Sequence, residues 1–208
     1  MKVVDLKTEK SPSRFIEGTE WDRVTQDYIR QYKGVISSED CKHIIDTHKN
    51  LPTTALDEWD DQYWVESTNN STRMCDLISI KDEKIDAILF NAFTTMLTQY
   101  AQDNWRAASF MYDTGYTLIR FNEGDSTPIH HSPSGYSICA FIFLNNDCDG
   151  GELQFFAKSK TEVSVGGGVI FPAAFMFPNE ILPVTKGVRY AVKTEFRTKL
   201  PSDHIHSH

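Results

Sequence analysis

The second half of the chain is a succession of short β-forming segments, and this pattern constrains the fold more than any other feature. From Ser109 to Phe196 these segments alternate with turns rich in glycine, asparagine and aspartate. Tyr136–Leu144 is a nearly continuous apolar strand. About eight strands of such length favour a jelly roll.

Two helices are predicted before these strands. Ser37, with Asp40 three residues later, approximates a capping box, and apolar residues then recur at helical spacing until Pro52. A second helix is expected from about residue 82 to residue 102, with an apolar stripe along one face. Two helices followed by many strands predict an α+β fold in which the helices lie on one sheet.

Turn residues and composition divide the chain further. Gly115, within Tyr112–Tyr116, has the placement typical of a hairpin turn, and short strands are also expected at residues 162–165 and 175–177. Residues 1–33 are predicted to form an N-terminal arm and residues 34–198 one domain. Residues 199–208, which contain alternating histidines, are predicted to be a flexible tail.

Charge and cysteine usage limit the environment and the partners. The 208-residue chain has a net charge of −8, which argues against nucleic acid or an anionic membrane as the main partner, because both attract positive charge. No apolar run approaches the roughly 20 residues of a membrane span, and the first residues lack a signal-peptide core. A cytoplasmic protein is therefore expected. The cysteines lack the spacing of a metal or redox motif and are expected to be free, buried thiols.

Several motifs occur in a fixed order along the chain. They are Ser37–Cys41, Ser71–Arg73, Tyr116–Gly124, Phe143–Asn145 with Gly150–Leu153, Gly166–Pro172 and Pro183–Tyr190. Together they resemble the Fe(II)/2-oxoglutarate oxygenases of the prolyl-4-hydroxylase-like branch, and among these the phage-encoded members. The resemblance extends from Val35 to Phe196 and implies a double-stranded β-helix, which is a jelly roll, with the N-terminal helices packed on one sheet.

The resemblance also implies a metal site, but two of its ligand positions carry other residues. The family holds iron with a His-x-Asp pair and a distant histidine, a 2-His-1-carboxylate triad. The corresponding residues here are His130, Ser132 and Asn179. A hydroxyl and an amide are weak, neutral ligands, so most of the affinity for Fe(II) should be lost. No histidine lies between His131 and His204, which excludes a displaced distal ligand.

Other side chains could replace the missing iron ligands only if the backbone near them were irregular. His131 points to the opposite strand face from His130, so only one of them can serve as a ligand. Three acidic residues lie close to the ligand positions in the sequence, namely Glu123, Asp125 and Glu180. Glu180 would point away from Asn179 on a strand, and the other two precede His130 by several residues.

The cosubstrate side is better preserved. Arg189, ten residues after Asn179, corresponds to the basic residue that binds the distal carboxylate of 2-oxoglutarate in the family, and Thr185 could add a hydroxyl contact. Phe121 and Phe143 occupy positions where the family often has tyrosines.

Arg189 also has a purely structural explanation, an ion pair with Glu195 or Glu152, and both explanations stay open.

Three functions are compatible with these residues. The leading hypothesis is a non-catalytic binding or structural module without cofactors, which acts through a protein partner or self-assembly. A virion-associated protein is one form of it, located in the virion or the host cytoplasm if phage-encoded. Trp59, Tyr63 and Trp64 either contact a partner or cover the edge of the barrel itself. The alternative is an active hydroxylase that uses Fe(II) and 2-oxoglutarate with a non-standard ligand set. The third is a sensor that binds a dicarboxylate through Arg189 without turnover.

Overall fold

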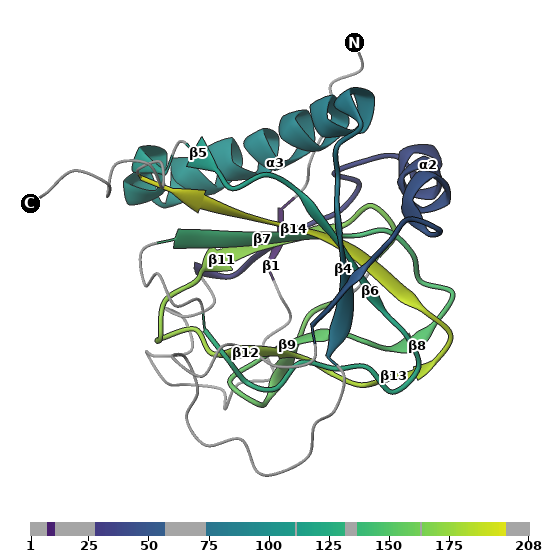
Figure 1. Ribbon diagram of the computed structural model, residues 1–208. Helices are drawn as coiled ribbons and strands as arrows, with labels where there is room; N and C mark the ends of the chain where they lie inside the picture. The colour runs from purple at the N-terminus through teal and green to yellow at the C-terminus, as the bar shows by residue number, and fades with distance from the viewer. Residues whose placement is uncertain are drawn as a thin grey trace, which may run out of the picture.

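The structure, a computed structural model, describes residues 8–10, 28–56, 74–110, 112–131, 137–162 and 164–198. These residues form helices, a large antiparallel sheet and two smaller sheets, stacked as layers (Figure 1). The predicted α+β jelly roll with helices on one sheet is confirmed. The aromatic cluster around Trp59, most of the N-terminal arm and the histidine-containing tail lie outside the described residues.

Both predicted helices form, and a side chain caps the first turn of each. Helix α2 spans Ser38–His48, and the Ser37 hydroxyl accepts a hydrogen bond from a first-turn amide at 3.0 Å. Helix α3 spans Glu83–Asp103, and the Asp82 carboxylate accepts from two first-turn amides, each at 3.0 Å. These caps satisfy amides that have no partner within a helix. A short 3-10 helix, η2, follows at Trp105–Ser109. Among the described residues, no helix is long and apolar enough to cross a membrane.

The large sheet contains nine of the described strands. Their bounds are Thr8–Lys10 (β1), Arg30–Tyr32 (β2), Thr54–Leu56 (β3), Cys75–Ser79 (β4), Tyr112–Asp113 (β5), Thr117–Phe121 (β6), Ser137–Phe143 (β7), Gly168–Pro172 (β11) and Arg189–Arg197 (β14). The order across the sheet is β1-β2-β11-β7-β14-β6-β4-β3, and β5 also pairs with β14. The strand at residues 30–32 thus joins the end of the predicted arm to the domain's own sheet.

The smaller sheets lie on the side of the large sheet away from the helices (Figure 1). One has the order β10-β9-β12 and the other pairs β13 with β8. Their bounds are Asp149–Gly150 (β8), Leu153–Phe155 (β9), Ser159–Lys160 (β10), Asn179–Ile181 (β12) and Val184–Lys186 (β13).

Two apolar cores separate these layers. The first joins α3 residues such as Phe93 and Met96 to the large sheet, through side chains such as Val192 of β14. The second lies between the large and small sheets and includes Ala191 of β14 and Ile181 of β12. Successive strand residues point to opposite faces, so β14 contributes alternately to both cores. The face toward the second core is called the inner face below.

Some predicted strands do not form. Tyr112–Tyr116 is not a hairpin turn, because β5 and β6 pair with β14 at different points along it and not with each other. Gly115 has a φ of +81° and its amide donates to the Asp113 carboxylate, so the chain kinks and then continues beside the same neighbour. The strands expected at residues 162–165 and 175–177 are also wrong, since the described residues there lie outside strands.

None of the four cysteines forms a disulfide, as predicted, but Cys148 is half-buried where a buried thiol is expected. Cys41, Cys75 and Cys139 are buried in the two cores. Burial raises the pKa of Cys41 to about 11 and that of Cys139 to about 12, so both thiols are protonated at neutral pH.

Candidate metal centre

The first and last positions of the degenerate triad lie directly opposite each other. His130 and Asn179 form an antiparallel bridge in which each backbone amide donates to the other's carbonyl oxygen at 2.8 Å. Residues opposite each other in such a pair project from the same face. Asn179 is buried and shares its strand face with Ile181 of the second core. The structure therefore brings both positions together on the inner face, as the resemblance implies.

The His130 ring is oriented by a backbone contact. Its Nδ1 lies 2.9 Å from the Pro128 carbonyl oxygen, and a carbonyl oxygen can only accept, so Nδ1 carries the proton. Burial, followed by the positive charge of Lys193, lowers the pKa of His130 to about 4. The ring is thus neutral at neutral pH. A neutral imidazole with Nδ1 donating to a carbonyl is a common form of metal-binding histidine, so His130 retains the chemistry of a ligand.

Asn179 is used by the backbone around it. Its Nδ2 donates to the Phe177 carbonyl oxygen at 3.2 Å and to the His130 carbonyl oxygen at 3.3 Å. Only the neutral amide oxygen then retains ligand chemistry. Such an oxygen is a poor substitute for the imidazole or carboxylate that non-haem Fe(II) sites use.

The acids considered as replacement ligands are engaged elsewhere. Asp125 is buried and its Oδ2 accepts from the Asn122 backbone amide at 2.8 Å and from the Asn122 side chain at 3.0 Å. Glu180 accepts from Gln154 at 2.7 Å. The remaining triad position, Ser132, lies outside the described residues.

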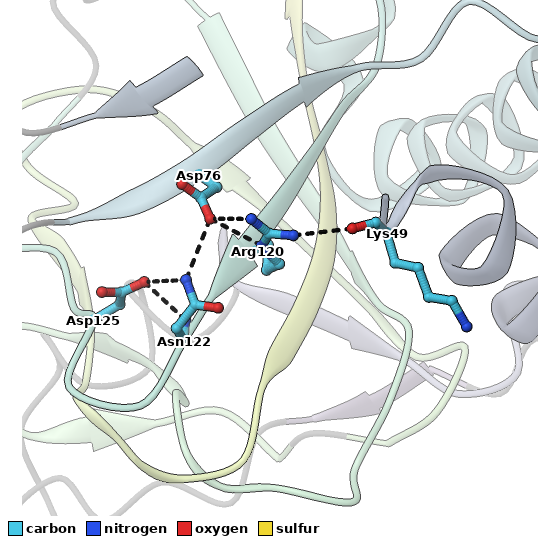
Figure 2. Close-up of polar contacts among 5 residues, drawn as sticks. All are labelled: Lys49, Asp76, Arg120, Asn122 and Asp125. Carbon is cyan, nitrogen blue, oxygen red and sulfur yellow. Dashed lines mark hydrogen bonds and ion pairs between the residues drawn. The ribbon is translucent and has the colours of Figure 1, made fainter. Parts of the chain in front are cut away.

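Asp125 belongs to a polar network that anchors the turn after β6 (Figure 2). Asp76 on β4 accepts from Nε and Nη2 of Arg120 at 2.9 and 2.6 Å, and Arg120 also donates to the Lys49 carbonyl oxygen at 3.0 Å. The Asn122 amide bridges the two carboxylates, at 3.2 Å from Asp76 and 3.0 Å from Asp125. Because these contacts join α2, β4 and β6, the network has a structural role.

The donors present do not fit a 2-His-1-carboxylate iron site. Within the described part of the chain, no three His, Cys, Asp or Glu side chains are arranged to hold a metal ion. Glu123, the third acid considered, is exposed. His130 supplies one imidazole and Asn179 one amide oxygen, while a hydroxyl at Ser132 would bring no negative charge.

Arg189 is a buried residue bound to backbone oxygens. Its Nη1 donates to the Asn145 carbonyl at 2.8 Å and its Nη2 to the Gly150 carbonyl at 2.7 Å. It makes no ion pair with Glu152 or Glu195 among the described residues. Its Nε is buried without a hydrogen-bond partner. The guanidinium therefore ties β14 to the turn after β7.

The paired glycines of that turn make room for these contacts. Gly150 has a φ of +80°, and a Cβ there would collide with the Pro183 carbonyl oxygen. A Cβ on Gly151 would lie 3.1 Å from Nε of Arg189. The glycine pair is thus needed for close approach of the chain. Thr185, the other predicted cosubstrate contact, is exposed on β13.

Phenylalanine rings fill the space between the large and small sheets. Phe141 stacks on Phe171 with ring centroids 6.3 Å apart, and Phe155 meets Phe171 edge-on at 4.7 Å. Phe121 and Phe143 belong to the same core and are each 1% exposed. Burial of such a side chain stabilises the fold by about 1.5–3 kcal/mol. Neither Phe121 nor Phe143 has a hydroxyl that could donate a hydrogen bond to a dicarboxylate.

The inner face of β14 also carries charges that no motif indicates. Glu195 accepts from Lys193 Nζ and from Arg197 Nη2, both at 3.3 Å. Burial opposes the charge of Lys193, but Cys139 and Glu195 raise its pKa above the usual value. Burial likewise opposes the charge of Glu195, but Lys193 and Arg197 lower its pKa. The pair is ionised, and both of its charges influence the pKa of His130.

Comparison with known proteins supports the fold alone. No protein-family model and no curated protein matches the sequence. The viral collagen prolyl hydroxylase of Paramecium Bursaria Chlorella virus-1, solved as a 2-oxoglutarate complex, is similar with a TM-score of 0.60 and 12% identity, over 83% of this chain and 97% of that one. A Pseudomonas putida prolyl-4-hydroxylase has a TM-score of 0.56 and 15% identity, over 83% and 93%.

A third similar structure is a prolyl hydroxylase from Trichoplax adhaerens, with a TM-score of 0.58 and 12% identity over 88% of this chain and 94% of that one. Each similarity spans more than 90% of the other chain. The chain therefore has the double-stranded β-helix fold of the prolyl-4-hydroxylase-like Fe(II)/2-oxoglutarate oxygenases.

Proposed function

We propose that this protein is a non-catalytic derivative of the oxygenase fold that serves as a binding or structural module. The contact pattern of Asn179 carries the proposal. Its side chain faces the inner side directly opposite His130, yet its amide donates to two backbone carbonyls. It therefore supports the local backbone where a metal ligand would be required.

The residues at the positions expected to bind 2-oxoglutarate support the same function. Arg189 makes two short hydrogen bonds to turn carbonyls, and to bind a carboxylate it would have to give up contacts that hold β14 in place. Phe121 and Phe143 pack into the second core. A dicarboxylate entering there would have to displace well-packed rings, which is costly in a close-packed interior.

The charge of Lys193 also disfavours a metal ion at this position. Its ammonium group is close enough to His130 to lower the pKa of that ring, and a positive charge at this position repels a divalent cation. Glu195 could attract a cation, but it is already paired with Lys193 and Arg197. The inner face thus holds its own cation beside the one remaining imidazole.

As a module, the protein would act through a partner protein or a second copy of itself. Its net charge of −8 disfavours nucleic acid, and a jelly roll is a rigid platform on which binding surfaces can be built. A virion-associated role is one specific form of this proposal.

Cobalt(II) titration, followed by its d–d absorption, tests the loss of the metal site. We expect no binding by the parent protein up to millimolar Co(II). The Ser132→Asp, Asn179→His variant should bind weakly, and adding Lys193→Thr should bind more tightly because the opposing charge is gone. A His130→Ala change in that triple variant is the matched control and should abolish binding. Micromolar binding by the parent that depends on His130 would contradict the proposal.

A further inference from the structure

The charged residues on the inner face of β14 have more donor capacity than their contacts use. Lys193 and Arg197 share the single carboxylate of Glu195, so the three together carry one excess positive charge. An ammonium has three N–H donors and a guanidinium five, whereas each of these contacts engages one nitrogen. Arg197 Nε is buried without a hydrogen-bond partner.

The cluster lies at one end of the barrel and is reachable from solvent. Phe196 of β14 pairs with Ile138 of β7, which pairs with Pro172 at the end of β11. The ends of three neighbouring strands therefore lie side by side there. The side chains of Lys193 and Arg197 are 25% and 37% exposed, so a ligand can reach both of them.

Exposed apolar side chains occur at the same end of the barrel. Phe175 and Met176, in the turn that follows β11, are 73% and 54% exposed, and Ile129 beside the His130–Asn179 bridge is 47% exposed. Exposed apolar groups that gather near a polar centre are typical of binding surfaces. These three residues are called the apolar rim.

This partly exposed excess of positive charge favours an anionic ligand. A partly buried charge costs free energy unless a partner and hydrogen bonds compensate it. One carboxylate would match the single excess charge, and its planar oxygens suit a guanidinium fork. A doubly charged phosphate would leave an uncompensated negative charge beside Glu195.

We propose that this end of the barrel binds a ligand that carries one carboxylate on an apolar body. Lys193 and Arg197 receive the carboxylate, and the apolar rim contacts the body. This inference rests on the proposed function, because an interior without metal and 2-oxoglutarate leaves these donors available to another ligand. Arg189 is not part of the site, since its donors are bound to carbonyls.

Isothermal titration calorimetry with 3-phenylpropionate, in the presence of a metal chelator, tests the site. Its amide, 3-phenylpropanamide, has nearly the same shape without the charge and should bind at least about tenfold more weakly, because hydrogen bonds to charged groups contribute the difference. A peptide that ends in a free phenylalanine carboxylate, compared with the same peptide amidated, separates a protein chain end from a small acid as the natural source.

Two variants should change the affinity in opposite directions. Arg197→Gln should weaken 3-phenylpropionate binding about tenfold, whereas Glu195→Gln should tighten it, because it frees both cations from their internal partner. Arg106→Gln is the matched control, since Arg106 is exposed on η2 beside Trp105. A fold defect alone would not produce opposite shifts.

Equal binding of acid and amide, no binding of either carboxylate, or affinities unchanged in both variants would overturn the inference. If no carboxylate binds and the parent also fails to bind Co(II), the site is refuted while the proposed function stands. Carboxylate binding that requires a divalent metal would refute both.

Discussion

Replacement of Arg189 distinguishes a structural arginine from a cosubstrate clamp. Arg189→Met removes two hydrogen bonds from a charged donor to half-buried turn carbonyls, at 2.8 and 2.7 Å. Each such bond contributes about 1.5–3 kcal/mol, so the free energy of unfolding should fall by about 3–6 kcal/mol. Domains of this size lose about 2–4 °C in melting temperature per kcal/mol, so a drop of at least about 6 °C is expected without any ligand.

Urea denaturation followed by circular dichroism measures this loss. Arg189→Lys keeps the charge and can donate to one of the two carbonyls, so it should recover about half of the stability. Arg106→Met is the matched control and should stay within about 1 kcal/mol of the parent, because its guanidinium stacks over exposed Trp105. A structural role for Arg189 is refuted if Arg189→Met is as stable as the parent while 2-oxoglutarate raises the melting temperature of the parent alone.

Other predictions concern stability. Asp76→Asn should lower the free energy of unfolding by about 3–5 kcal/mol, because Arg120 loses a buried partner; chemical denaturation measures this, and an unchanged midpoint would contradict it. The pKa of His130 is about 4 in the folded protein against 6.5 in the unfolded chain. The contribution of the neutral ring to the free energy of unfolding is therefore present above pH 6.5 and is lost as the pH falls toward 4. The free energy of unfolding, measured by denaturation at several pH values, should therefore fall less steeply between pH 6.5 and pH 4 in His130→Gln than in the parent. Identical pH profiles for the two proteins would refute this prediction. Gly150→Ala should lower stability by at least about 1–2 kcal/mol, since φ is +80° and the Cβ meets the Pro183 carbonyl oxygen; an unchanged melting temperature would count against this geometry.

Local chemistry explains why the helices could be predicted and some strands could not. Ser37 and Asp82 cap helices through contacts within three residues, so a sequence pattern contains the whole signal. The kink at Gly115 depends on where β14 lies, about 80 residues later in the chain, and glycine placement alone cannot distinguish it from a hairpin turn. Strand pairing is set by tertiary contacts, which is why the hairpin turn predicted at residues 112–116 does not form.

The candidate site is likewise only partly predictable from the sequence. The pairing of His130 with Asn179 was implied only by the ordered motifs of a resemblance, because 49 residues separate them. The charges at Lys193, Glu195 and Arg197 alternate with period two, a pattern that usually indicates a solvated face. Here that face points toward the second core, and only the pairing of β14 with its neighbours reveals it.

Anaerobic titration of the parent protein with Fe(II) and 2-oxoglutarate is the most direct test of the central claim. A 2-oxoglutarate chelate on Fe(II) gives a metal-to-ligand charge-transfer band, which reports metal and cosubstrate together. We predict no band at micromolar to millimolar Fe(II), because Asn179 and Arg189 are both committed to backbone carbonyls. A saturable band with micromolar affinity, lost on His130→Ala, would contradict the account.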